Sequence, residues 1–283
     1  MTGYREENKL IMDKNAPIGV FDSGVGGLTV AREIMRQIPN ERIVYFGDTA
    51  RVPYGSKSKD NIIKFSRQII RFLQTENVKA IVIACNTASA LALDEMQQEF
   101  DLPILGVVKP GAKVAVETTA NKRIGLIGTE ANIRSGVYTR YIKSLDDEAK
   151  VFEKACPLFV PLVEEGWLHD DITFQVASRY LEELKEKDID TLIMGCTHYP
   201  LIRSTIRKVM GDKVNLVNPA YETAIELKNL LERDNLANKC DVDSPSSMYR
   251  FYVSDAEEKF KLFANSILPF DITMTKQINI ENY

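Results

Sequence analysis

The chain contains 283 residues, of which 45% are hydrophobic and 27% are charged, and its formal net charge is −4. A typical domain has about 100–150 residues, so this length predicts two domains with a cleft between them. The composition excludes a disordered or fibrous protein, and a weakly acidic chain without a Lys/Arg-rich block lacks the footprint of nucleic-acid binding. We therefore expect a small-molecule partner and no nucleic-acid partner.

The amino-terminal sequence MTGYREENKLIMDKN has mixed charge and lacks the apolar run of a signal peptide. No later segment reaches the roughly 18 consecutive apolar residues that a membrane helix needs. These features predict a cytoplasmic protein with no membrane partner. The four cysteines form no CxxC pair, so we expect thiols and not a disulfide framework.

Short apolar runs alternate with segments of helical periodicity, which predicts an α/β fold with doubly wound parallel sheets. In chain order, the predicted strands are Ile18–Phe21, Ile43–Phe46, Ala80–Ala84, Ile104–Val107, Ile124–Ile127, Leu158–Val163, Thr191–Met194 and Val214–Val217. The predicted helices are Leu28–Ile38, Ile62–Leu73, Ala88–Phe100, Ile172–Leu184, Leu201–Met210 and Glu222–Leu231. In the tail, Met248–Val253 and the helix-like Ala256–Leu262 could complete a sheet.

Ligands of open parallel sheets bind at the carboxyl ends of the strands, so the turns after the predicted strands should carry the function. These turns are DSG (Asp22–Gly24), GDT (Gly47–Thr49), CNT (Cys85–Thr87), VKPG (Val108–Gly111), GTE (Gly128–Glu130), EEG (Glu164–Gly166) and CTHYP (Cys196–Pro200). Two of them begin with cysteine, and their surroundings, IVIACNTASA and TLIMGCTHYP, are alike. Since the two cysteines are about one domain length apart, two similar lobes could set them facing each other across the cleft.

Two facing thiols suit the inversion of a carbon acid. A thiolate removes the proton from one face, a thiol returns a proton to the other, and the roles exchange in the reverse direction. Each cysteine precedes a predicted helix, whose amino terminus favours a thiolate and offers N–H groups to substrate carboxylates. The turns after the predicted strands offer further donors, at Ser23, Asn86, Thr87 and Thr197. Acids and bases that could move protons to the thiols are Asp22, Glu164 and His198.

Four motifs, GVFDSGVGGLTV, YFGDTARVPYG, ACNTASA and GCTHYPLI, resemble those of glutamate racemases in the aspartate/glutamate racemase family, in the same order and over about 18–219. The resemblance implies two lobes related by pseudo-twofold symmetry and catalytic cysteines at Cys85 and Cys196. It implies that Asp22 assists the first cysteine and that Glu164 and His198 assist the second. It also implies substrate contacts at Asp22, Ser23, Tyr54, Gly55, Asn86, Thr87, Thr129, Thr197 and His198.

The same resemblance implies glutamate as substrate, no cofactor or metal, and a bacterial role in supplying D-glutamate for peptidoglycan; a homodimer stays open. It suggests a first lobe of residues 1–110 plus 220–283 and a second lobe of residues 111–219. Because Glu165 is adjacent to Glu164, the resemblance leaves open which of the two glutamates assists the second cysteine. Asn132 stands where the family often has threonine, which puts the contact at this position in doubt.

Other interpretations of single motifs have weaker support in the sequence. Gly24 and Gly26 after the first strand, with Asp48 after the second, partly match a dinucleotide-binding pattern, but the third glycine is replaced by Thr29. Cys196 and His198 are too few ligands for zinc. Lys109 in VKPG is weak support for a pyridoxal phosphate lysine. Asp22, Thr87 and Thr197 could simply cap helices, which is compatible with ligand binding.

Cys156 and Cys240 lack a matching polar turn and are expected to be inert. A non-enzymatic binding protein would be favoured only if both Cys85 and Cys196 proved unreactive. Aspartate racemase is the nearest alternative in chemistry. Relatives of that type tend to have a Glu residue directly after the second Cys-Thr pair, where this chain has His198. This difference favours glutamate over aspartate as the substrate.

Overall fold

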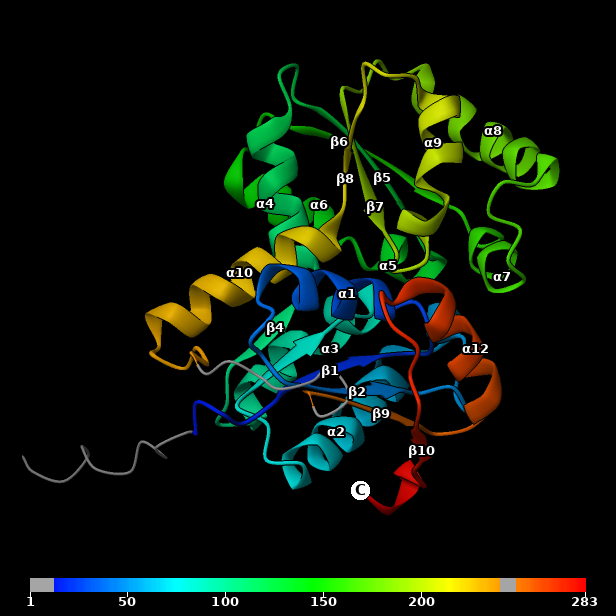
Figure 1. Ribbon diagram of the computed structural model, residues 1–283. Coiled ribbons are helices and arrows are strands. Elements are labelled where there is room, and N and C mark those ends of the chain that lie inside the picture. The colour runs from blue at the N-terminus through cyan, green and yellow to red at the C-terminus, as the bar shows by residue number, and fades with distance from the viewer. Residues whose placement is uncertain (1–12, 240–247) are drawn as a thin grey trace, which may run out of the picture.

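The structure is a computed structural model that describes residues 13–239 and 248–283 (Figure 1). Two parallel sheets lie one above the other in this view. The six-stranded sheet has the order β10-β9-β2-β1-β3-β4 and contains β1 (Ile18–Asp22), β2 (Ile43–Gly47), β3 (Ala80–Ile83), β4 (Ile104–Gly106), β9 (Tyr249–Val253) and β10 (Thr275–Gln277). The four-stranded sheet has the order β6-β5-β7-β8 and contains β5 (Arg123–Gly128), β6 (Lys150–Ala155), β7 (Thr191–Gly195) and β8 (Asn215–Val217).

Both sheets repeat one strand order, because β2-β1-β3-β4 corresponds to β6-β5-β7-β8. In each quartet the chain passes from the first strand to the second toward one edge of the sheet (β1 to β2, β5 to β6). It then passes from the third strand to the fourth toward the other edge (β3 to β4, β7 to β8). The carboxyl ends of the first and third strands therefore form a topological switch point, where ligands of such sheets bind. Cys85 follows the third strand of the first quartet, and Cys196 follows the third strand of the second. The predicted pair of similar lobes is therefore confirmed.

Helices cover the faces of the sheets (Figure 1). Those next to the six-stranded sheet include α1 (Leu28–Gln37), η1 (Tyr54–Ser56), α2 (Lys59–Thr75), α3 (Asn86–Glu99), α12 (Glu257–Ile267) and η3 (Ile280–Asn282). Those next to the four-stranded sheet include α5 (Glu130–Ser135), α6 (Val137–Leu145), α7 (Phe159–Glu164), α8 (Asp171–Lys185), η2 (Tyr199–Ile202) and α9 (Arg203–Met210). One helix follows the last strand of each quartet. After β4, α4 (Val108–Thr118) leads into the second sheet, and after β8, α10 (Pro219–Arg233) leads out of it and contacts both α4 and α1.

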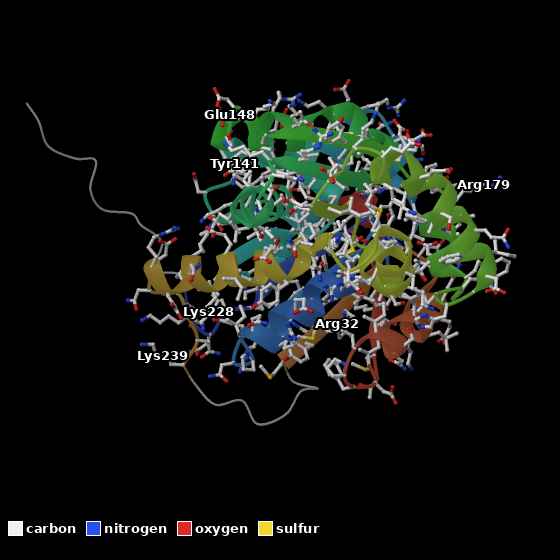
Figure 2. The ribbon with its side chains drawn as sticks, turned by 90° about the horizontal axis from the view of Figure 1, so that it is seen from above. Arg32, Tyr141, Glu148, Arg179, Lys228 and Lys239 are labelled. Atoms are coloured by element: carbon white, nitrogen blue, oxygen red, sulfur yellow. The ribbon has the colours of Figure 1, made fainter. Side chains whose placement is uncertain are left out.

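Apolar cores lie on both faces of both sheets, which explains the continuous apolar strands of the sequence. In β1, Ile18 and Val20 face one core, while Phe21 faces the other. Seen from above, charged side chains such as Glu148, Arg179 and Lys228 project from the periphery (Figure 2). Charged side chains that are buried inside the protein are therefore the candidates for a functional role. No helix within 13–239 and 248–283 is long and apolar enough to cross a membrane.

The structure corrects the predicted elements in two places. The segment Leu158–Val163 was predicted as a strand, but it belongs largely to α7. The strand at this point is β6, whose sequence KVFEKA mixes charged and apolar residues because it is an edge strand and is only partly buried. The VKPG segment is not a turn but the first turn of α4, where a proline costs the helix no hydrogen bond. The tail prediction is confirmed: β9 pairs with β2, and α12 follows it.

Candidate active site

Cys85 lies between β3 and α3, where it caps the amino terminus of the helix. Its Sγ accepts a hydrogen bond from Ala88 N at 3.5 Å and lies 3.8 Å from Ser23 Oγ. Burial, together with the charge of Asp22, raises the pKa of the Cys85 thiol to about 12, against the lowering effect of the contacts with Ala88 and Ser23. These surroundings favour the thiol form of Cys85 over the thiolate at neutral pH.

Asp22 ends β1, the neighbour of β3 in the sheet, and its side chain is fully buried. Its Oδ2 accepts a hydrogen bond from Gly24 N at 3.0 Å, and its Oδ1 accepts one from Thr197 Oγ1 at 3.5 Å. Burial raises the pKa of Asp22, while the charge of His198 and backbone N–H groups of the turn lower it. An acid with raised proton affinity thus stands close enough for its charge to act on Cys85.

Cys196 begins a chain of three ionisable groups in the second lobe. Its Sγ lies 3.7 Å from His198 Nδ1, and His198 Nε2 lies 3.1 Å from Glu164 Oε1 at the end of α7. Cys196 and His198 are buried, whereas the Glu164 side chain is 29% exposed. Of the two adjacent glutamates, Glu164 makes this contact, while Glu165 is exposed.

Electrostatics favour a charged imidazole at His198. Burial lowers its pKa, but the contacts with Cys196 and Glu164 and the charge of Asp22 outweigh burial and raise the pKa to about 10. Correspondingly, the hydrogen bond from His198 lowers the pKa of Glu164. At neutral pH, an imidazolium therefore lies between a carboxylate and the Cys196 sulfur, and a cation beside a thiol stabilises the thiolate.

The first lobe contacts the turn after Cys196 directly. Thr29 Oγ1 donates a hydrogen bond to Thr197 O at 3.0 Å. At Gly26, a Cβ atom would come within 2.4 Å of Thr197 Oγ1 and 2.5 Å of the His198 ring. Only glycine allows this approach, which gives Gly26 a role unrelated to phosphate binding.

A second set of contacts crosses the cleft beside Cys85. Thr87 and Thr129 hydroxyls lie 3.0 Å apart, and the Tyr138 hydroxyl donates to Asn86 Oδ1 at 2.7 Å. A Cβ atom at Gly55 would lie 3.0 Å from Thr129 Cβ. The predicted contact residues of the two lobes are thus brought together. Tyr138 joins them without having been singled out from the sequence.

Tyr54, in η1, is buried, and its hydroxyl donates to Asp48 Oδ2. The same Asp48 carboxylate accepts hydrogen bonds from Arg51 Nε at 2.7 Å and Ser254 Oγ at 2.8 Å. Asp48 therefore holds the turn that carries Tyr54 and Gly55. The sequence drew attention to Asp48 as part of the GDT turn and of a partial dinucleotide pattern, but not as the residue that holds Tyr54.

Asn132 supports the end of the strand that carries the second cysteine. Its Nδ2 donates to the carbonyl of Gly195 at 2.8 Å, and its backbone N donates to Thr129 Oγ1 at 3.3 Å. The departure from the family pattern thus leaves a hydrogen-bond donor next to Cys196. Cys156 is buried, and Cys240 lies outside the described residues.

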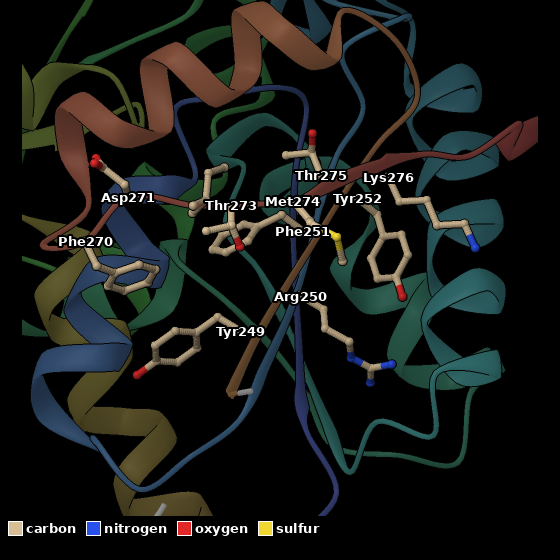
Figure 3. Close-up of a pocket in the computed structure, with 11 residues that line it drawn as sticks. Tyr249, Arg250, Phe251, Tyr252, Phe270, Asp271, Thr273, Met274, Thr275 and Lys276 are labelled. Atoms are coloured by element: carbon tan, nitrogen blue, oxygen red, sulfur yellow. The ribbon is translucent and has the colours of Figure 1, made fainter. Parts of the chain in front are cut away.

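One cavity in the structure borders the site. It has about 90 Å³ and is lined by Gly24, Val25, Thr49, Val52, Glu164, Ala256, Lys259, Phe260 and Phe263. Another of about 410 Å³ lies beside β9, and the residues that line it, from Tyr249–Tyr252 and Phe270–Lys276, include none of the predicted site residues (Figure 3). In the described parts of the chain, no three His, Cys, Asp or Glu side chains are grouped to hold a metal ion.

The sequence model of the family "Asp/Glu/Hydantoin racemase" matches residues 18–225. The chain belongs to this family. Among members of the Asp/Glu/hydantoin racemase family, a glutamate racemase from Geobacter metallireducens is 44% identical over 264 residues, which cover 93% of this chain and 97% of the relative. Most of the chain is therefore alike, not only the motifs.

Two solved structures of glutamate racemases share the architecture. An isoform from Bacillus anthracis superposes with a TM-score of 0.89 at 39% identity, covering 94% of this chain and 98% of that one. The enzyme from Francisella tularensis, solved in complex with D-glutamate, has a TM-score of 0.88 at 38% identity, covering 95% and 100% of the respective chains. Within the Asp/Glu/hydantoin racemase family, the chain is thus similar to the glutamate racemases in sequence and fold.

Proposed function

We propose that the protein interconverts L- and D-glutamate by proton transfer at Cys85 and Cys196, with no cofactor. The observation that carries this proposal is the placement of the two thiols. Each follows the third strand of an equivalent quartet, and contacts between the lobes bring the two turns to one cleft. The glutamate racemase relatives, one of them crystallised with D-glutamate, support glutamate as the substrate.

The chemistry begins with L-glutamate. A thiolate at Cys196, next to the His198 imidazolium, takes the α-proton, and the electron pair of the broken C–H bond passes into the α-carboxylate. The Cys85 thiol then delivers its proton to the opposite face, which yields D-glutamate and a thiolate at Cys85. The reverse reaction uses the same groups with exchanged roles. Asp22 assists Cys85, while Glu164 and His198 assist Cys196.

The transition state concentrates negative charge on the α-carboxylate, so N–H and O–H donors should surround it. Donors of the first lobe that suit this task come from Ser23, Tyr54, Gly55, Asn86 and Thr87. Those of the second lobe come from Thr129, Thr197 and His198. Contacts such as Thr87–Thr129 bring both sets together and support their assignment to one substrate.

The remaining features are proposed on the same footing. We assign residues 1–110 plus 220–283 to the first lobe and 111–219 to the second, in accord with the membership of the two sheets. A cytoplasmic location and a supply of D-glutamate for peptidoglycan fit the glutamate racemase relatives. A homodimer is the oligomeric form to test, by sedimentation of the purified protein.

A chiral assay tests the proposal. Purified protein incubated with pure L-glutamate should produce D-glutamate until both enantiomers are equal, and pure D-glutamate should reach the same end point. Aspartate should react far more slowly, because the Cys-Thr-His turn is expected to set the length of the diacid. Comparable rates for both diacids would reduce the conclusion to an amino-acid racemase, and no racemisation of either would reject it.

A further inference from the structure

The Cys196 side of the site is connected to the protein surface. The chain Cys196–His198–Glu164 runs from a buried thiol to a carboxylate that is 29% exposed. On the Cys85 side, by contrast, the acid Asp22 is fully buried. The two thiols therefore stand in different electrostatic surroundings, although the strands that carry them are equivalent.

Glu164, the exposed member of the series Cys196–His198–Glu164, lines the cavity of about 90 Å³ described above. One water needs about 10–15 Å³ of such volume, so the cavity has room for several waters. Its walls carry two opposite charges: Glu164 from α7 and Lys259 from α12. Lys259 is exposed to solvent. Figure 1 shows α12 below α7 on the same side of the molecule.

The helix that carries Lys259 is held in place by both lobes. Phe263, one turn further along α12, packs against apolar cores of the first and of the second lobe. Two cations act on the Glu164 carboxylate: His198, whose hydrogen bond has the largest effect, and Lys259, and both lower the Glu164 pKa. Glu165, the next residue in the chain, is exposed.

We propose that Lys259 is a positioning residue for proton transfer at Cys196, acting on Glu164 across the cavity that both residues line. This inference rests on the proposed racemase function and adds to it a residue outside the family motifs. An ionised Glu164 stabilises the His198 imidazolium, which in turn stabilises the thiolate at Cys196. Lys259 lines the same cavity as Glu164 and, in addition to His198, favours the ionised form of the carboxylate that accepts the hydrogen bond from His198.

The first test compares Lys259→Met with Lys259→Arg and Lys261→Met. Lys261 is a matched control, because it lies on the same helix and its Nζ contacts the carbonyl of Thr273 at 3.4 Å. For Lys259→Met, we expect kcat/KM for glutamate to fall by about two- to fivefold at low salt, the size typical of an exposed charge. The acid limb of the pH profile should move to higher pH, because Glu164 loses a cation that favours its ionised form. Lys259→Arg should restore the wild-type profile.

Two further measurements separate this role from a structural one. The difference between wild type and Lys259→Met should vanish near 1 M salt, where the screening length is about 3 Å. In a Glu164→Gln background, Lys259→Met should have no further effect, because the interaction under test is absent. A loss of activity that is insensitive to salt, or that persists in the Glu164→Gln background, would overturn the proposal.

Isotope effects test the assignment to Cys196. If Lys259→Met slows transfer at Cys196, the effect of α-deuteration on kcat/KM should grow for L-glutamate, because Cys196 removes that proton. For D-glutamate the isotope effect should shrink, because removal of the α-proton by Cys85 then limits the rate less than the slowed proton delivery from Cys196. Equal changes for the two enantiomers would contradict the assignment. Failure of wild-type racemisation would reject the proposed function, whereas an active wild type with Lys259→Met equal to Lys261→Met would reject only the role of Lys259.

Discussion

Thr197 Oγ1 donates a hydrogen bond to Asp22 Oδ1 at 3.5 Å, and this contact joins the turn after Cys196 to the acid beside Cys85. Thr29 Oγ1 donates to the carbonyl of the same Thr197. A residue of the second half-site is therefore held by the first lobe on both its side chain and its backbone. Because of this link, the two half-sites should respond together when Thr197 is changed.

We expect Thr197→Val to lower kcat in both directions, because the substitution keeps the shape and removes the hydroxyl donor to Asp22. Loss of one hydrogen bond corresponds to about 0.5–1.5 kcal/mol, or about 2- to 13-fold. Thr197→Ser, which keeps the hydroxyl, should retain most of the activity. Initial rates from each enantiomer measure the effect. Wild-type rates in Thr197→Val would show that the hydroxyl has no part in the reaction.

Each cysteine of the pair should be indispensable. Cys85→Ser and Cys196→Ser should each lower racemisation by about 10²–10⁴-fold in both directions, because a hydroxyl of much higher pKa is a poor base at neutral pH. The matched control is Cys156→Ser, since Cys156 is also buried in the second lobe and contacts the carbonyl of Lys154. Circular dichroism should show that all three variants are folded. Near-normal turnover in either Cys85→Ser or Cys196→Ser would rule out the two-thiol mechanism.

The raised pKa of His198 makes a prediction for stability. Its pKa is about 10 in the folded protein, above the ordinary value of 6.5. A group whose pKa rises on folding stabilises the protein fully below its unfolded pKa, and the contribution is lost as pH rises through the folded pKa. The free energy of unfolding contributed by His198 should therefore be largest below about pH 6.5 and disappear towards pH 10.

Urea unfolding of wild type and His198→Gln at several pH values measures this contribution. The difference between the two proteins should be larger at pH 6 than at pH 10. The same substitution at the exposed His169, His169→Gln, is the control. A difference that grows with pH would mean that His198 is neutral in the folded protein.

Activity should not depend on a metal or on pyridoxal phosphate, because the two thiols supply both proton transfers. Purified protein dialysed against EDTA should keep its initial rate with either enantiomer, and its absorbance spectrum should contain only protein bands. The matched control is the same protein dialysed without EDTA. Loss of activity that a metal or a cofactor restores would refute this prediction.

The sequence predicted the strand ends and their cysteines well, because strands buried on both faces are nearly continuous apolar runs. It failed at β6, an edge strand whose KVFEKA sequence mixes charged and apolar residues, and the neighbouring apolar segment was taken for the strand. Contacts made by tertiary packing left no local signal either. The Tyr138–Asn86 hydrogen bond joins residues of different lobes, and nothing in the sequence around Tyr138 indicates it.

The placement of Lys259 near Glu164 is also a result of tertiary packing without a local sequence signal, because the sequence predicts α12 only as a tail helix. Its approach to Glu164 depends on how the returning chain packs across both lobes. Sequence motifs thus indicated the two thiols and the acids and bases that assist them. Lys259, which we propose acts on Glu164, comes from an element far away in the chain.

The assignment of faces can be tested with solvent deuterium. In D₂O, both thiols exchange with solvent before the substrate binds. Cys196 then removes a proton from L-glutamate, and Cys85 delivers deuterium to the other face, so D-glutamate formed early should be deuterated at the α-carbon. If the intermediate returns instead, Cys196 gives back the proton it took, and recovered L-glutamate stays protiated.

Mass spectrometry of the separated enantiomers at low conversion measures the deuterium content of both product and recovered substrate. Starting from D-glutamate, the pattern should be the mirror image. Deuterium entering substrate and product equally fast would indicate one base that serves both faces.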